Sequence, residues 1–239
     1  MATMAQTRDR PEIRFHDEIS SAWERLHQSR TFKARTAAMF DLLGNADLHG
    51  QRWLDAGCGT GTLSRLLAAR GCDVTGVDAS SEMIAAARGR SADGPSAERL
   101  TFRQIPTIAN LPFADRSFDG VLCASVLEYV PDVAQCLAQI HRVLRPGGLL
   151  LLSIPNRGSL LRQGYKLAHA ASSRVSARPL FRYLAFSKFD TTPDVMQGLL
   201  RQHGLTMLGA SFAGSPLPPA LDRRPAVGTL INILARRDN

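Results

Sequence analysis

Short apolar runs alternate with longer amphipathic segments through the middle of the chain. The runs have the length and composition of buried strands, and they are Arg52–Ala56, Asp73–Val77, Leu100–Gln104, Gly120–Ala124 and Leu149–Ile154. Helical periodicity fills the gaps, at Leu63–Arg70, from a cap at Ser80 or Ser81 to Arg88, and at Val133–Leu144. This alternation is typical of a parallel sheet with crossover helices. We therefore predict an α/β fold: a doubly wound, mostly parallel sheet with helices on both faces.

The two ends of the chain depart from this alternation. Leu205–Phe212 and Thr229–Ala235 are strand-like, with a proline-rich loop and no obvious helix between them. A parallel pair would need a long crossover, so we expect an antiparallel C-terminal strand. Residues 12–43 predict one or two helices, with an apolar stripe at Ile13, Phe15, Ile19, Trp23 and Leu26. The turn Arg145-Pro146-Gly147-Gly148 is expected to lead into the fifth strand.

Composition and charge narrow the class of protein. The 239 residues are 44% hydrophobic and 21% charged, the balance of a globular domain. Four scattered cysteines without metal-ligand spacing favour a reducing compartment and predict no metal site. No apolar run is long enough to span a bilayer and no secretory signal is recognisable, so we expect a cytoplasmic protein. The net charge of +8 is concentrated in residues 156–190, where seven basic groups face Asp190 alone.

A glycine-rich loop between the first strand and its helix is the strongest functional signal. The loop reads Asp55-Ala56-Gly57-Cys58-Gly59-Thr60-Gly61, and Asp78 ends the second strand 21 residues after Gly57. Glycines allow a tight turn and a close ligand, and a carboxylate at Asp78 is placed to bind a ribose diol. A dinucleotide fingerprint would need glycine where Thr62 stands. Asp55 disfavours a pyrophosphate and suits a cationic ligand such as S-adenosylmethionine.

Several segments together resemble one enzyme family. They are Leu54–Gly61, Val77-Asp78, Leu111-Pro112-Phe113 with Ser117-Phe118-Asp119, and Leu144–Gly148. The chain resembles the class I S-adenosylmethionine-dependent methyltransferases, in the small-molecule group that includes the ubiquinone-biosynthesis enzymes. The resemblance is close over residues 50–154 and looser to the end. It implies a Rossmann-like fold with S-adenosyl-L-methionine as cofactor.

The resemblance also implies a cofactor site. In it, the loop glycines border the methionine part, Asp55 lies near the amino group, Asp78 binds the ribose, and Met83 and Ile108 flank the adenine. Thr107 stands where the family often has Asp, and its hydroxyl accepts a hydrogen bond less strongly than a carboxylate. The expected cofactor contacts are Asp55, Gly57, Cys58, Gly59, Gly61, Asp78, Ala79, Met83, Thr107, Ile108 and Ser125.

An acceptor site is expected beyond the fourth strand. There the family often carries Leu-Glu-His, and this chain has Glu128 followed by Tyr129, a potential cation–π partner for the sulfonium. No base is identified, and the catalytic residues are unknown. The expected substrate contacts are Phe15, His16, Trp23, Glu128, Tyr129 and Asn156. By spacing alone, Phe15 and Trp23 are more often buried core residues, although a helical lid would place the same rings against the bound cofactor or substrate.

The predicted organisation is one methyltransferase domain over residues 1–239. It comprises an N-terminal helical lid (1–49), a cofactor-binding core (50–155), a basic substrate-cap insertion (156–190), and a C-terminal helix with antiparallel strands (191–239). In the insertion, we expect one apolar helical face at Leu160, Leu161, Tyr165, Ala168, Ala171 and Val175, with Arg162, Lys166 and Arg174 nearer the other face. This segment is either a solvated cap on the cleft or a peripheral contact with an anionic membrane at the inner face.

The function expected from these observations is methyl transfer to a small organic acceptor that is lipophilic or acidic, with O-methylation favoured. Two alternatives remain. One is a catalytically silent S-adenosylmethionine-binding protein with a regulatory or partner role. The other is an RNA methyltransferase, which is disfavoured because the basic groups are confined to one insertion without an aromatic platform. Acceptor identity and oligomeric state do not follow from the sequence.

Overall fold

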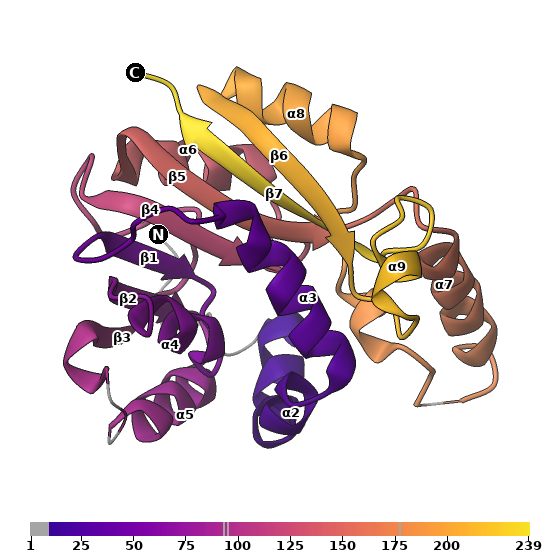
Figure 1. Ribbon diagram of the computed structural model, residues 1–239. Coiled ribbons are helices and arrows are strands. Elements are labelled where there is room, and N and C mark those ends of the chain that lie inside the picture. Colours follow the sequence, from indigo (N-terminus) through magenta and orange to yellow (C-terminus); the bar gives the residue numbers. More distant parts are fainter. Residues whose placement is uncertain (1–9, 93, 95, 177) are drawn as a thin grey trace.

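A seven-stranded sheet runs through the centre of the molecule (Figure 1). The computed structural model describes residues 10–92, 94, 96–176 and 178–239, without the side chains of residues 20–27. The strand order is β3-β2-β1-β4-β5-β7-β6, and β7 runs antiparallel to both of its neighbours. The strands are β1 Arg52–Ala56, β2 Asp73–Asp78, β3 Leu100–Gln104, β4 Phe118–Ala124, β5 Leu144–Pro155, β6 Leu205–Ala213 and β7 Leu230–Arg237. The predicted fold class is confirmed.

Helices cover both faces of this sheet. The described helices are α2 Pro11–His27, α3 Arg30–Phe40, α4 Thr62–Ala68, α5 Ser81–Ser91, α6 Val133–Val143, α7 Leu160–Ser172, α8 Pro193–Gln202 and α9 Pro219–Asp222. On one face, α3 and α4 pack over Trp53 and Leu122. On the other, α6 and α8 pack over Leu54 and Val121. The central strands β1, β4, β5 and β7 alternate their side chains between the two clusters, because successive residues of a strand point to opposite faces.

The order of the strands determines where a ligand can bind. The chain proceeds from β1 outward to β2 and β3, and then crosses to β4 on the other side of β1. β1, β2 and β4 are parallel, so their carboxyl ends meet at the same edge. A crevice forms at such a switch point, because the loops that follow the two central strands diverge there. The loops after β1 and β4 are the two that carry the predicted site.

Two sequence predictions about connections are wrong in detail. Residues 145–148 form an irregular part of β5 rather than a turn before it: Phe118 pairs with Leu144 and Gly120 with Leu149, with a register shift between them. The extra residues are accommodated at Gly147, whose φ is +75°. Between β6 and β7 the proline-rich loop contains the short helix α9, stabilised by Asp222, whose carboxylate accepts hydrogen bonds from the backbone N–H groups of Gly214 and Ser215.

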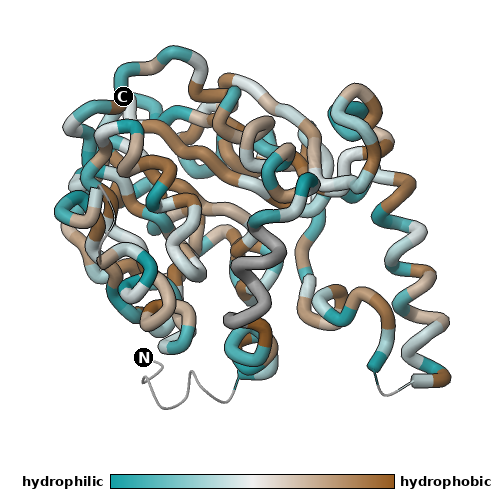
Figure 2. The backbone as a smooth tube through the Cα atoms, turned by 60° about the horizontal axis from the view of Figure 1, so that its bottom comes forward, coloured by the Kyte–Doolittle hydropathy of each residue, from teal (hydrophilic) through white to brown (hydrophobic). Residues whose placement is uncertain are grey.

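The insertion folds as α7 followed by a 3-10 turn, η3 Arg182–Ala185, beside the α9 loop (Figure 1). The division of α7 into an apolar and a basic face does not match the burial of its residues. Leu160, from the expected apolar face, is 75% exposed, whereas Arg162, from the expected basic face, is only 2% exposed. Figure 2 shows hydrophobic residues recurring along this outer helix. Periodicity alone could not choose the buried face, because polar partners for Arg162 come from residues more than twenty positions further along the chain.

The N-terminal residues form two helices, α2 and α3, as the stripe of apolar residues predicts. Ser29 begins α3, with its side chain accepting a hydrogen bond from the Phe32 N–H. α2 packs against α5 and reaches it through Asp17, whose carboxylate accepts a hydrogen bond from the Ser80 hydroxyl. None of the helices in the described ranges combines the length and hydropathy of a membrane span.

Candidate functional site

The glycine-rich loop after β1 makes the first wall of the site. Gly57, Gly59 and Gly61 have φ values of +85°, +52° and +75°, which other residues rarely adopt. A Cβ added to Gly57 would lie 2.2 Å from Cγ2 of Val126. The loop is held to β2 by hydrogen bonds from the Gly57 and Cys58 N–H groups to the Val77 carbonyl, at 2.8 and 2.9 Å. The loops after β1 and β4 are therefore in close contact.

Asp78 projects from the end of β2 into the same crevice. One carboxylate oxygen accepts a hydrogen bond from the Gly59 N–H and the other from the Ser80 N–H, both at 2.9 Å. Burial raises the pKa of Asp78, while these backbone bonds and the nearby His16 oppose the rise. Each carboxylate oxygen can accept more than one hydrogen bond. Asp78 is therefore fixed in place and still able to accept a pair of hydroxyl groups.

Asp55 does not reach the crevice, contrary to the expected contact with an amino group. Its carboxylate is buried and accepts a 2.6 Å hydrogen bond from the Ser64 hydroxyl of α4. The position of Asp55 in β1 explains where its side chain points. Asp55 lies two residues after Trp53, so both side chains point to the sheet face that α3 and α4 cover. Burial raises the pKa of Asp55 to about 7, Asp78 adds to the rise, and the Ser64 bond opposes it.

This shift predicts a pH-dependent stability. A carboxyl group whose pKa is raised on folding stabilises the folded state fully below its unfolded pKa, near 4, and the contribution is lost as the pH rises through about 7. We expect Asp55→Asn to remove this loss. The difference in unfolding free energy between the variant and the natural protein should grow by about 2–3 kcal/mol from pH 5 to pH 8. Urea unfolding at both pH values measures it, and a constant difference would contradict the assignment.

The far end of the crevice is apolar and matches the predicted adenine region. Met83 from α5 and Ile108 from the loop after β3 are buried there. Thr107 lies beside them, and its hydroxyl oxygen accepts a 3.1 Å hydrogen bond from the Ala109 N–H. The Thr107 hydroxyl therefore stabilises its own loop, although it can still offer a polar contact to a ligand.

One cavity of about 540 Å³ joins these walls to the predicted acceptor region. Most of the predicted residues lie on its wall: Gly57, Cys58, Gly59, Asp78, Ala79, Met83, Thr107, Ile108, Ser125, Glu128, Tyr129, Phe15 and His16. Its size falls within the usual range for small-molecule sites. The cavity forms where the sheet order predicts it, outside the carboxyl ends of β1, β2 and β4.

Two further predicted contacts, Gly61 and Asn156, are not among the residues that line the cavity. Gly61 is turned away from the cavity, toward Phe102 and Ala87. Asn156 is buried outside it, because its side-chain amide donates hydrogen bonds to the carbonyls of Pro225 and Gly228 and its oxygen accepts one from Gly158 N–H. The Asn156 prediction is therefore corrected: the residue fastens β5 to the loop before β7. The side chain of Trp23 lies outside the described part of the structure.

The tip of β4 is held by an arginine that the sequence did not single out. Ser125 has a φ of +56°, an uncommon value for a residue other than glycine. Its hydroxyl oxygen accepts a 2.8 Å hydrogen bond from Nη2 of Arg35, and its N–H donates to the Ser153 carbonyl. Strained backbone of this kind persists where the surrounding structure fixes it, often at a binding site. Arg35 lies 90 residues earlier, on α3, so no local pattern could identify it.

Aromatic side chains from the N-terminal helix close the acceptor end of the cavity. The ring of His16 lies 5.0 Å from that of Tyr129, edge to face, and Phe15 packs 5.2 Å from Phe186. Nδ1 of His16 lies 2.6 Å from the Glu12 carbonyl oxygen. A carbonyl oxygen can only accept, so Nδ1 of His16 donates this hydrogen bond. α2 therefore brings an imidazole ring as well as apolar cover to the cavity.

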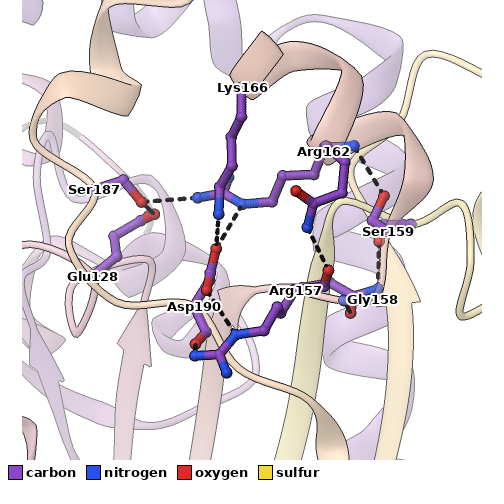
Figure 3. Close-up of polar contacts among 11 residues, drawn as sticks. Glu128, Arg157, Gly158, Ser159, Arg162, Lys166, Ser187 and Asp190 are labelled. Atoms are coloured by element: carbon purple, nitrogen blue, oxygen red, sulfur yellow. Dashed lines mark hydrogen bonds and ion pairs between the residues drawn. The ribbon is translucent and has the colours of Figure 1, made fainter. Parts of the chain in front are cut away.

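Glu128 lies buried at the same end, at the start of a chain of polar contacts (Figure 3). Its carboxylate accepts a 2.9 Å hydrogen bond from the Ser187 hydroxyl, and Ser187 in turn accepts a 2.8 Å bond from Nη2 of Arg162. Burial raises the pKa of Glu128, whereas Arg162 and Arg35 lower it. The sequence analysis predicted Glu128, but it did not identify Arg162 or Tyr183, which also line the cavity.

Comparison with known proteins identifies the region that builds this cavity. Residues 54–152, which contain β1 to β5 as far as Leu152, match the family model described as a methyltransferase domain. This region is a methyltransferase domain. The match confirms the predicted family, and with it S-adenosylmethionine as the cofactor.

Relatives resemble the chain in sequence over this domain and in fold over most of its length. The ubiquinone biosynthesis O-methyltransferase of Psychrobacter arcticus is 39% identical over 110 residues, which are 46% of this chain and 43% of that protein. The chain thus matches less than half of that relative. Magnesium protoporphyrin IX methyltransferase from Synechocystis, solved with bound S-adenosylhomocysteine, has a TM-score of 0.69 at 18% identity and covers 94% of this chain and 98% of its own.

A second solved structure resembles the fold over the full chain. It is the 1,6-didemethyltoxoflavin-N1-methyltransferase of Burkholderia thailandensis, with a TM-score of 0.65 at 20% identity, covering 100% of this chain and 92% of its own. At these identities the structural likeness concerns the fold of the methyltransferase domain and its flanking elements. The acceptor that each enzyme uses differs, so the fold does not select one.

The residues of the methyltransferase domain fit its cofactor. Gly57 and Gly59 bring backbone to the cavity wall, and a Cβ at Gly57 would collide with Val126. Asp78 offers a fixed carboxylate for a diol, and Met83 with Ile108 offers an apolar slot for a planar base. The Tyr129 ring lines the same cavity and suits a cationic group. These features would hold S-adenosylmethionine along one side of the cavity, leaving the aromatic end for an acceptor.

Proposed function

We propose that this chain transfers a methyl group from S-adenosylmethionine to a small lipophilic or acidic organic acceptor, with oxygen as the favoured acceptor atom. The observation that supports this most directly is a continuous cavity of about 540 Å³, which is lined by Asp78 and Met83 and also by Phe15 and Tyr129. A protein that only stored the cofactor would not need an aromatic space beside it. Oxygen is favoured because the sequence relative from Psychrobacter arcticus is an O-methyltransferase.

The chain contributes mainly by alignment. When bound, S-adenosylmethionine supplies a methyl group activated by its positive sulfur, which a nucleophilic acceptor atom can displace in one in-line step. The loops after β1 and β4 hold the two reactants in one enclosed space, and α2 covers it with Phe15 and His16. Correct alignment and exclusion of water can lower such a barrier by roughly 7–11 kcal/mol. A strong base is therefore not essential for every acceptor.

A hydroxyl acceptor must lose a proton as the bond to carbon forms. Glu128 and His16 both line the acceptor end and can receive it. Burial raises the pKa of Glu128, and a higher pKa makes its carboxylate a stronger proton acceptor. His16 places its imidazole ring on the same part of the cavity wall, beside Tyr129. These two residues are the proposed routes for the proton.

A labelled-methyl assay tests the proposal. Purified protein is incubated with methyl-labelled S-adenosylmethionine and a cell extract, which is then separated into organic-soluble, RNA and protein fractions. We expect label in the organic-soluble fraction with the natural protein and with Asp132→Ala, whose side chain lies outside the cavity. The Asp78→Ala variant should transfer little label to the organic-soluble fraction. Binding of the cofactor without label in any fraction would favour a silent regulatory protein, and label in RNA would replace the proposed acceptor class.

A peripheral contact between the insertion and an anionic membrane is the finer part of the proposal. Leu160, Leu167 and Val175 are exposed, which supports an apolar contact. Arg174 and Arg178 are exposed nearby and could face anionic lipid. Flotation with phosphatidylglycerol vesicles at low salt tests the contact. We expect the natural protein to float and a Leu160→Asn, Leu167→Asn double variant to stay in solution; equal behaviour of the two would remove the contact from the proposal.

A further inference from the structure

Two arginines border the acceptor end of an otherwise largely apolar and aromatic cavity. Arg35 comes from α3 and Arg162 from the insertion helix α7, and both line the cavity wall. Burying a guanidinium is costly unless its charge and its donors are matched. The hydrogen bonds that each guanidinium makes within the protein therefore show which of its N–H donors remain for a ligand.

Arg35 uses only part of its hydrogen-bonding capacity. Its Nη2 donates to the hydroxyl oxygens of Ser125 and Ser153, at 2.8 and 3.4 Å. Among the described residues, no hydrogen bond involves its Nε or Nη1. Burial lowers the pKa of Arg35, with Glu128 opposing the change. An arginine in this position still carries its charge, and two of its nitrogens are left for a ligand in the cavity.

Arg162 is similarly incomplete. Its Nη2 donates to the Ser187 hydroxyl oxygen at 2.8 Å (Figure 3). Its buried Nε has no hydrogen-bond partner among the described residues. Asp190 is 3.9 Å from that Nε, beyond hydrogen-bonding distance. The Asp190 carboxylate instead bonds to Arg157 and Lys166, while Arg162 is only its more distant ion-pair partner.

Arg35 and Arg162 share one carboxylate at this end of the cavity. Both act on Glu128, whereas Arg157 and Lys166 pair with Asp190, and none of these last three residues lines the cavity. A ligand group with one negative charge would match the second guanidinium and satisfy donors of both arginines. A dianion would lie close to Glu128 and be repelled by it.

We infer that the acceptor carries a carboxylate that Arg35 and Arg162 bind at the floor of the cavity, with its aromatic or other planar body against Phe15 and Tyr129. Guanidinium groups suit a carboxylate because their planar donors match its two oxygens. This inference rests on the proposed function, and it specifies the acceptor class that the proposal leaves open. It also assigns to Arg35 a binding role in addition to its contact with Ser125.

Calorimetry with a matched pair of probes tests the inference. The protein is first saturated with S-adenosylhomocysteine and then titrated with benzoate or with benzamide, which have the same shape and differ in charge. We expect benzoate to bind about tenfold more tightly to the natural protein, the effect of one charge-assisted hydrogen bond. Arg35→Gln should abolish the preference. Arg223→Gln is the matched control, because Arg223 pairs with the exposed Asp41 and does not line the cavity.

The outcomes separate this inference from the proposal beneath it. If S-adenosylhomocysteine fails to bind, the proposed function and the inference both fail. If it binds and the natural protein does not distinguish benzoate from benzamide, the carboxylate inference alone is wrong; this comparison needs no variant and so does not depend on whether Arg35→Gln folds. Tighter binding of phenyl phosphate than of benzoate would also overturn the assignment to a carboxylate.

Discussion

Gly57→Ala is expected to lower the free energy of unfolding by about 2–5 kcal/mol. The new Cβ would lie 2.2 Å from Cγ2 of Val126, and the residue would have to keep a φ of +85°. A left-handed backbone costs a non-glycine residue about 1–2 kcal/mol, and overpacking adds about 1–3 kcal/mol. The same side chain would push the loop after β1 away from the loop after β4, so cofactor affinity should fall as well.

Gly147→Ala separates the two causes of this loss. Gly147 has a similar φ of +75°, but a Cβ there would meet nothing within 4 Å. This control should therefore lose only about 1–2 kcal/mol in urea unfolding. Equal losses in the two variants would show that the contact with Val126 is not tight, and would weaken the argument that these loops form one rigid wall.

Asp78→Ala is expected to weaken binding of S-adenosylhomocysteine at least tenfold. Hydrogen bonds to a charged group contribute about 1.5–3 kcal/mol each, and Asp78 can accept both ribose hydroxyls. The variant also loses the bonds that fix the Gly59 and Ser80 N–H groups. Calorimetry measures the change in affinity, and circular dichroism at increasing temperature shows whether the fold remains.

Asp132→Ala is the control for Asp78→Ala. Asp132 begins α6, and its side chain accepts a 2.9 Å hydrogen bond from the Gln135 N–H. Its removal should cost about 1 kcal/mol of stability without changing cofactor affinity. If the two variants bound the ligand equally well, Asp78 would not be a ribose contact.

The sequence predicts the core of the fold because the information for it is local. The alternation of strands and helices, the loop at Gly57 and the carboxylate at Asp78 each depend on neighbouring residues. The direction of Asp55 was also within reach, because the two-residue period of a strand puts it on the same face as Trp53, under α4. The resemblance suggested a ligand contact instead, and the structure corrects it.

The contacts that the sequence could not predict join distant parts of the chain. Arg35 meets Ser125 across 90 residues, and Arg162 meets Ser187 across 25. In the insertion, the contact with Ser187 accompanies the burial of Arg162, which the apolar periodicity of α7 could not predict. Asn156 was expected at the substrate. It directly follows β5, but its side-chain amide donates hydrogen bonds to the backbone carbonyls of Pro225 and Gly228, which lie far along the chain.

Competition between two ligands tests the central claim most directly. The claim is that the loop after β1 and Asp78 form a site for S-adenosylmethionine, not for a phosphorylated nucleotide. Calorimetry of the natural protein with S-adenosylhomocysteine, NAD⁺ and ADP measures the preference in one buffer. We expect S-adenosylhomocysteine to bind and neither phosphorylated ligand to displace it. Tighter binding of NAD⁺ or ADP, or no binding of S-adenosylhomocysteine, would contradict the account.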